Sequence, residues 1–114
     1  MELKTGTYKG KNIRFVEVPI DFNGKEEIVR IKKLTFGENL SLRQAVSKIT
    51  VLGGQEKIEV DQQKLSEECL LKSITQAPFE INVANIRDLE MDIGEMLLEV
   101  YREVNTFASK KKDN

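Results

Sequence analysis

The side chains that could carry out chemistry in this chain are carboxylates and a single thiol. The sequence has 19 Asp and Glu residues, one Cys and no His. Without His, the chain lacks the commonest general base and the commonest metal ligand, and one Cys cannot form a disulfide within the chain. Carboxylate acid–base catalysis and attack by a thiol are the two kinds of chemistry that these side chains could support.

The carboxylates offer two close pairs, Glu67 with Glu68 and Glu95 with Glu99. An acid–base pair needs a cleft in which the two pKa values are driven apart. Both pairs fall on the polar faces of predicted helices, where a solvated surface is the simpler interpretation. We therefore expect no catalytic residues among them and no metal site.

Cys69 and Gly53-Gly54 are the other candidates for chemistry. Cys69 would need an activating base, and its apolar neighbours Leu65 and Ile74 favour a small buried hydrophobe. Gly53-Gly54 lacks the lysine and hydroxyl residues of a phosphate-binding loop, so a turn explains it. No cofactor-binding residue is expected.

Basic side chains gather in the first third of the chain. They are Lys4, Lys9, Lys11, Arg14, Lys25, Arg30, Lys32 and Lys33. A net charge of −1, from 18 basic and 19 acidic residues, argues against a dedicated nucleic-acid binder. Arg30, Lys32 and Lys33 form a candidate basic patch; attraction to the acidic segment 90–103, or plain solvation, is the alternative.

The elements that must position these residues begin with a β-hairpin. Alternating apolar residues predict strands at 13–20 and 26–33, and Asn23-Gly24 between them is a strong hairpin signal. Pro19 marks a strand end or an edge. Residues 1–12 are interpreted as a flexible or edge-pairing arm.

Three main helices follow the hairpin. The first is expected at 36–49, begun by a capping box between Thr35 and Glu38, although Ser41 could begin it later. Residues 50–52 and 57–60 form either a second small hairpin around Gly53-Gly54 or a loop. The second helix is expected from an Asp61 cap to Gln76, and the third at 92–107, after a short turn begun by Asn82. The sequence thus predicts one α+β domain at 1–109 and a charged tail at 110–114.

Two apolar residues fall off the buried stripe of the third helix. Leu98 lies about a quarter turn from that stripe and close in angle to Met91. Either they contact the N-terminal hairpin or they bind a partner, and Met96 is an adaptable neighbour because methionine repacks easily. The N-terminus lacks the apolar region of a signal peptide, no apolar run reaches the roughly 20 residues that span a bilayer, and an unpaired Cys suits a reducing cytoplasm.

Four phrases in succession resemble the small tail assembly chaperones of long-tailed bacteriophages and prophages. They are IVRIKKLTFGENLSL (28–42), LGGQEKIEVDQQKLSEECLLKSI (52–74), APFEINVANIRDL (77–89) and DIGEMLLEVYREVN (92–105). The resemblance implies a non-enzymatic protein of the host cell cytoplasm that binds the tape-measure protein while tail-tube protein polymerises around it. A homo-oligomer is also expected, because an elongated client offers many equivalent sites. The resemblance assigns no contact residues; from the chemistry of this sequence itself, Met91 and Leu98 are the expected contacts, with Met96 as an adaptable neighbour.

The resemblance also implies that a programmed frameshift could extend the chain. Lys110-Lys111-Lys112 could be encoded by an A-rich slippery site, and a solvated basic tail is the alternative. Two other functions stay open: another tail component, such as a tail-completion or tube-associated protein, and a small nucleic-acid-binding regulatory domain that uses the basic hairpin.

Overall fold

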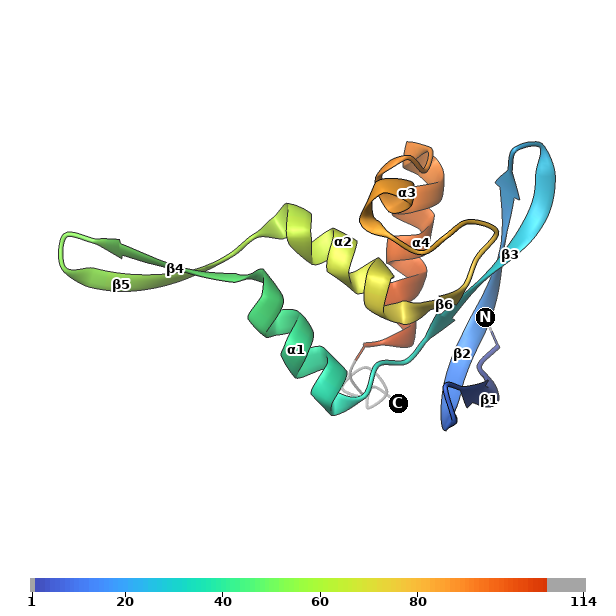
Figure 1. The fold of residues 1–114 in the computed structure, drawn as a ribbon, viewed down its shortest axis with the longest axis horizontal. Coiled ribbons are helices and arrows are strands. Elements are labelled where there is room, and N and C mark those ends of the chain that lie inside the picture. The colour runs from blue at the N-terminus through green and yellow to red at the C-terminus, as the bar shows by residue number, and fades with distance from the viewer. Residues whose placement is uncertain (1, 107–114) are drawn as a thin grey trace, which may run out of the picture.

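The chain forms an antiparallel sheet packed against helices, with a second hairpin that projects away from them (Figure 1). The computed structural model describes residues 2–106, apart from the side chains of Thr50 and Leu52. The strands are β1 (Lys4–Tyr8), β2 (Lys11–Phe22), β3 (Lys25–Lys32), β4 (Ser47–Leu52), β5 (Gln55–Val60) and β6 (Ile74–Gln76). The helices are α1 (Phe36–Val46), α2 (Gln62–Ser73), α3 (Val83–Arg87) and α4 (Met91–Val104). The predicted α+β class is confirmed, and the expectations for Phe107 and for the tail at 110–114 lie outside the described residues.

Strands β2 and β3 form the hairpin that the sequence predicts. Asn23 and Gly24 have φ values of 54° and 82°, which suit a two-residue turn between antiparallel strands. Val18 and Val29 face each other across the pair and are 2% and 0% exposed, so this face of the sheet belongs to the core. Pro19 lies on the part of β2 that β1 does not cover, where a missing N–H removes no bond between strands.

The first residues take the edge-pairing alternative rather than the flexible one. Strand β1 pairs antiparallel with the start of β2, joined by a turn in which Lys9 and Gly10 both have positive φ. The ring of Phe15 crosses the backbone of Gly6, where an added Cβ would lie 2.9 Å from Phe15 Cε1. Glycine at this position therefore lets the buried ring lie close to β1.

Helix α2 ends earlier than the sequence predicts. The expected helix extends to Gln76, but β6 occupies its last three residues and pairs antiparallel with β3, with Ile74 opposite Ile31. Ser73 ends the helix and donates from Oγ to the Cys69 carbonyl oxygen at 2.7 Å. Ile74 is 3% exposed in this strand. Its apolar spacing suits a buried helix face as well as a buried strand, and pairing with the sheet edge decides in favour of the strand.

The capping box begins α1 where the sequence places it, so the later start at Ser41 is wrong. Glu38 N donates to Thr35 Oγ1 at 3.1 Å, and Thr35 N donates to Glu38 Oε1 at 2.8 Å. The helix ends at Val46 rather than at Ile49, because Ser47 already begins β4. Asn82 caps α3. Helix α4 begins one residue before the predicted position and ends at Val104, earlier than the predicted end at 107, with Asn105 as its C-cap.

The core has two clusters that meet along α4. The larger cluster joins the sheet to α2, α3 and the buried stripe of α4, formed by Ile93, Leu97, Val100 and Val104. The smaller cluster contains Leu42, Val46 and Cys69, between α1 and α2. Leu98 and Tyr101 contact both clusters, so α4 connects the sheet to the α1–α2 pair.

Candidate functional site

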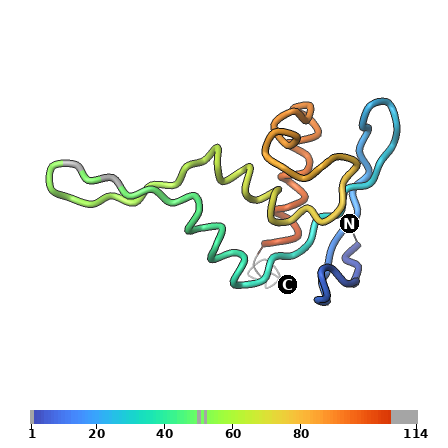
Figure 2. Tube along the Cα trace, in the orientation of Figure 1, coloured from blue at the N-terminus to red at the C-terminus, as the bar shows by residue number. Residues whose placement is uncertain are grey.

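The most prominent surface feature is a projecting hairpin formed by β4 and β5, which we call the arm (residues 47–60). The chain leaves the body along α1 and β4 and returns along β5 and α2, so that only the base of the arm adjoins the helices (Figures 1 and 2). Gly53 and Gly54 have φ values of 59° and 82° and form the turn at its tip. Of the two alternatives that the sequence left open for this region, the structure has the hairpin.

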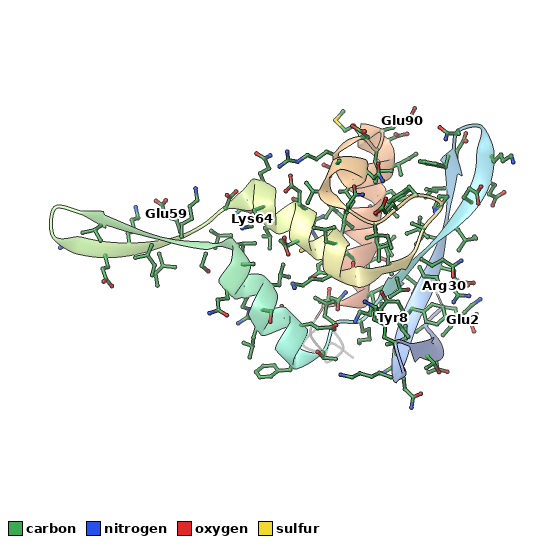
Figure 3. All side chains as sticks on the ribbon, in the orientation of Figure 1. Glu2, Tyr8, Arg30, Glu59, Lys64 and Glu90 are labelled. Carbon is green, nitrogen blue, oxygen red and sulfur yellow. The ribbon has the colours of Figure 1, made fainter. Side chains whose placement is uncertain are left out.

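The arm has one apolar face and one polar face. Strand alternation, with Ile49 opposite Ile58, puts four large apolar side chains on the same side. They are Ile49, Val51, Ile58 and Val60, which are 69%, 64%, 71% and 46% exposed. Lys48, Lys57 and Glu59 alternate with them on the opposite side, where Figure 3 shows Glu59 pointing away from the arm.

Burial of apolar side chains is the main favourable term in folding, so four exposed ones on a single face are unusual. The arm contains half of the large apolar residues that are exposed among the described side chains, and Phe36 and Leu40 of α1 add two more. A two-stranded hairpin is marginally stable when nothing covers it. The apolar face of the arm is therefore the strongest candidate for a surface that binds another molecule.

A second apolar surface surrounds Met91, at the start of α4. Here α2, α3 and α4 border a shallow, open hollow of about 400 Å³, with Leu70, Ile86, Leu89 and Leu98 in its lining. Met91 is 81% exposed. The predicted pair Met91 and Leu98 thus lies on one hollow.

Charged groups surround this hollow. Arg87 Nε donates to Glu67 Oε2 at 2.5 Å across its edge, and this hydrogen bond holds the pKa of Glu67 below its usual value. Glu90 and Glu95 also line it, and Figure 3 shows Glu90 beside the start of α4. An apolar floor with a charged rim is typical of a surface that binds a protein segment.

Met96 does not join Met91 and Leu98. It lies half-buried against the larger core cluster and is absent from the lining of the hollow. Leu98 is also half-buried and contacts both clusters, so it supports the fold as well as the hollow. Of the three residues that the sequence singles out, Met91 alone is extensively exposed.

The candidate basic patch is divided by intramolecular contacts. Arg30 Nε donates to Glu17 Oε2 at 3.0 Å, and Lys4 donates to the other oxygen of that carboxylate at 2.8 Å. Lys32 is 6% exposed and donates to Glu38 Oε2 at 2.5 Å. Lys33 is half-buried, just beyond the end of β3. Arg30, Lys32 and Lys33 therefore do not form one exposed cationic surface.

Of the carboxylates considered for catalysis, Glu67 and Glu68 are half-buried on α2 rather than on a solvated surface, and Glu67 pairs with Arg87. Glu95 and Glu99 are exposed on α4. Cys69 is buried in the smaller cluster, as expected for a small hydrophobe, and burial raises the pKa of its thiol. Within residues 2–106, no group of three or more His, Cys, Asp and Glu side chains could hold a metal ion.

Sequence reasoning missed most of the exposed apolar surface. The residues missed are Phe36, Leu40, Ile49, Val51, Ile58 and Val60. The available signal was the alternation of apolar and polar residues on both sides of Gly53-Gly54. This pattern predicts a hairpin with one apolar face, and no other predicted element was expected to cover that face.

None of the helices between residues 2 and 106 is long and apolar enough to cross a membrane. Comparisons of the chain with profiles of protein families, with curated proteins and with solved structures found no match.

Proposed function

We propose that this chain is a non-enzymatic tail assembly chaperone of a long-tailed bacteriophage or prophage. In this proposal it acts in the host cell cytoplasm, binds the tape-measure protein and assists assembly of the tail-tube protein around it. The family resemblance supports the proposal, and the observation that carries it is the apolar face of the arm. A protein whose task is to cover the apolar surface of another must itself expose apolar surface while unoccupied.

The mechanism is the physical covering of apolar segments. A long helical client exposes apolar stripes that would otherwise associate with one another. The apolar side chains of the arm and the hollow at Met91 can cover such stripes, because each apolar area that leaves water lowers the free energy. The charged side chains of Lys57 and Glu59, on the opposite face of the arm, keep the complex soluble.

The test is co-expression with the tape-measure protein of the same phage or prophage. The soluble fraction of that protein is measured with the wild-type chain, with the Ile49→Ser/Ile58→Ser variant and with the matched Lys48→Ser/Gln55→Ser variant, which changes only the polar face. We expect the wild-type chain and the polar-face variant to raise the soluble fraction several-fold, and the apolar-face variant to lose most of that gain. An unchanged soluble fraction with the wild-type chain would contradict the proposal.

A second experiment separates a chaperone from a tail component. A chaperone is absent from finished tails, whereas a tail-completion or tube-associated protein remains in them in fixed ratio to the tube subunit. Mass spectrometry of purified tails makes the distinction. Nucleic-acid binding is not favoured, because Arg30 and Lys32 are paired with carboxylates of the chain itself.

A further inference from the structure

The outer edge of β5 carries backbone groups that no strand of residues 2–106 pairs with. The two-residue turn makes Leu52 and Gln55 the closing pair, and hydrogen-bonded pairs then alternate along the arm. Asp61 N donates to the Val46 carbonyl at 2.8 Å, which continues this alternation to the base. The odd-numbered residues of β5 therefore direct their backbone N–H and C=O groups towards β4. The even-numbered residues direct theirs away from the hairpin. These are Glu56, Ile58 and Val60.

The charges along β5 are complementary to those of a second β5 that runs in the opposite direction. When two copies pair about Ile58, the outward backbone groups of residues 56, 58 and 60 meet those of residues 60, 58 and 56 in the other copy. Lys57 of each copy then lies opposite Glu59 of the other, which gives two attractive cross-strand pairs. Moving the register by one pair puts Lys57 opposite Lys57, or Glu59 opposite Glu59. Charge thus selects the register centred on Ile58.

We propose that two copies of this chain associate through antiparallel pairing of their β5 strands, centred on Ile58. The arm is suited to this because it extends free of the body, so both of its edges are accessible (Figure 1). The edge of β4 lacks the charge complementarity: pairing about Ile49 would put Lys48 opposite Thr50. Pairing of β5 converts two marginal hairpins into one four-stranded sheet, a size that is stable when one face is apolar.

The pairing brings the apolar faces of both arms together without covering them. Ile49, Val51, Ile58 and Val60 of the two copies share one side of the new sheet, because pairing about Ile58 keeps even-numbered residues of β5 on the same face. The inference concerns the chain alone and does not depend on a tape-measure client. It assigns the edge of the arm to a second copy and leaves the face of the arm available to other partners.

Charge variants test the register by sedimentation equilibrium of the purified full chain over a wide range of concentration. We expect the wild-type chain to form a reversible dimer. Lys57→Glu and Glu59→Lys should each weaken dimerisation about tenfold or more, because each change puts two pairs of like charges in contact. Lys11→Glu, a change of the same charge at the exposed start of β2, should leave it unchanged.

An equimolar mixture of the Lys57→Glu and Glu59→Lys variants is the decisive sample. One copy then presents two acids and the other two lysines, so the mixed dimer regains both attractive pairs. We expect association to recover in the mixture although each variant alone is weakened. The mixture also shows whether a variant is weakened only because its own hairpin is destabilised, since Glu59 pairs with Lys48 within the arm. Any such destabilisation stays in the mixture, so recovery of association can come only from the contacts between copies. Failure of the mixture to recover would overturn the proposed register.

Proline variants test the edge independently of charge. Residues 58 and 49 face each other, and both direct their N–H away from the hairpin, so Ile58→Pro and Ile49→Pro each remove one outward donor of the arm. We expect Ile58→Pro to abolish dimerisation and Ile49→Pro to retain it. A wild-type chain that stays monomeric at all concentrations, or a dimer that survives Ile58→Pro, would overturn the proposal. Neither result would affect the co-expression test of the chaperone function.

Discussion

Asn105 joins the end of α4 to the linker between β3 and α1 through its side-chain amide. Leu34 N donates to Asn105 Oδ1 at 2.7 Å, and Asn105 Nδ2 donates to the carbonyl oxygens of Lys32 and Tyr101 at 3.3 and 3.2 Å. In this linker the apolar pattern of the sequence changes from the two-residue period of a strand to the period of a helix. One amide thus bonds backbone groups of two segments, residues 32–34 and the end of α4, that meet only in the folded chain.

We predict that Asn105→Ala lowers the free energy of unfolding by about 1–3 kcal/mol, because the half-buried N–H of Leu34 and the carbonyl of Lys32 lose their partner. The Tyr101 carbonyl keeps the backbone N–H of residue 105 as a donor. Asn105→Asp keeps the oxygen that accepts from Leu34 N but loses both side-chain N–H donors. Its free energy of unfolding should therefore fall by at least the contribution of one hydrogen bond. Urea denaturation measures both, with the exposed Asn12→Ala as the control that should change little. A loss at position 105 no larger than that of the control would show that water replaces the amide.

The ion pair between Lys32 and Glu38 makes part of the stability depend on pH. Burial acts to raise the pKa of Glu38, but hydrogen bonds from Lys32 and from the backbone of Thr35 outweigh it and hold the pKa below the usual 4.5. A carboxyl with a lowered folded pKa adds stability above its unfolded pKa, and this stability is lost as the pH falls through the folded value.

We predict that the wild-type chain loses stability steadily as the pH falls from about 5 to 3. In Glu38→Gln the loss over this range should be smaller, because the amide does not titrate, and the variant should be less stable than wild type at pH 7. Urea midpoints measured at several pH values give both quantities. Equal pH dependence in the two proteins would mean that other carboxylates account for it.

The described side chains of the arm take no part in either core cluster. Its base is narrow: Asp61 N donates to the Val46 carbonyl at 2.8 Å, so a short linker can join α1 to α2 directly. We predict that replacing residues 47–60 with a linker of a few Gly and Ser residues changes the free energy of unfolding by less than about 1 kcal/mol. Dilute samples should be used, so that association does not contribute.

Val46→Ala is the matched comparison for removal of the arm. Val46 is 3% exposed in the smaller core cluster, so its truncation should cost about 1–3 kcal/mol although it changes only one residue at the base. Thermal or urea denaturation ranks the two proteins. A larger loss from removal of the arm would contradict the view that the arm is structurally independent of the core.

The elements show how far local sequence patterns determine the fold. The hairpin around Asn23-Gly24 and the capping box at Thr35 were predicted correctly, because turn and cap preferences depend on neighbouring residues alone. The ends of α1 and α2 were not, because β4 begins at Ser47 and β6 takes residues 74–76 through pairing with other strands. Partners distant in the sequence decide such boundaries, and no local period contains them.

The same distinction holds for the candidate surfaces. The angular relation between Met91 and Leu98 follows from helical geometry, and the structure places both on one hollow. The half-burial of Met96, by contrast, depends on packing against the larger core cluster, which its position on a helix does not specify. The exposure of Ile58 is likewise a property of the whole fold, since it requires that no other element reach the arm.

The whole molecule is more extended than its length requires. The radius of gyration of its Cα atoms is 16.0 Å, and the extents along the principal axes are 53, 37 and 31 Å. A compact domain of this length has a radius of gyration of about 13 Å. The arm accounts for the difference in shape, since it continues the long axis beyond the helices (Figure 1).

This shape gives a prediction for X-ray scattering that depends on both the arm and its pairing. At low concentration the radius of gyration should be near the 16.0 Å of the monomer, and removal of residues 47–60 should bring it towards about 13 Å. At high concentration, antiparallel pairing of β5 puts the two bodies at opposite ends of a shared sheet. The dimer should then exceed clearly the roughly 17 Å of a compact protein of twice the length. A dimer near that compact value would mean that the bodies, and not the arms, form the interface.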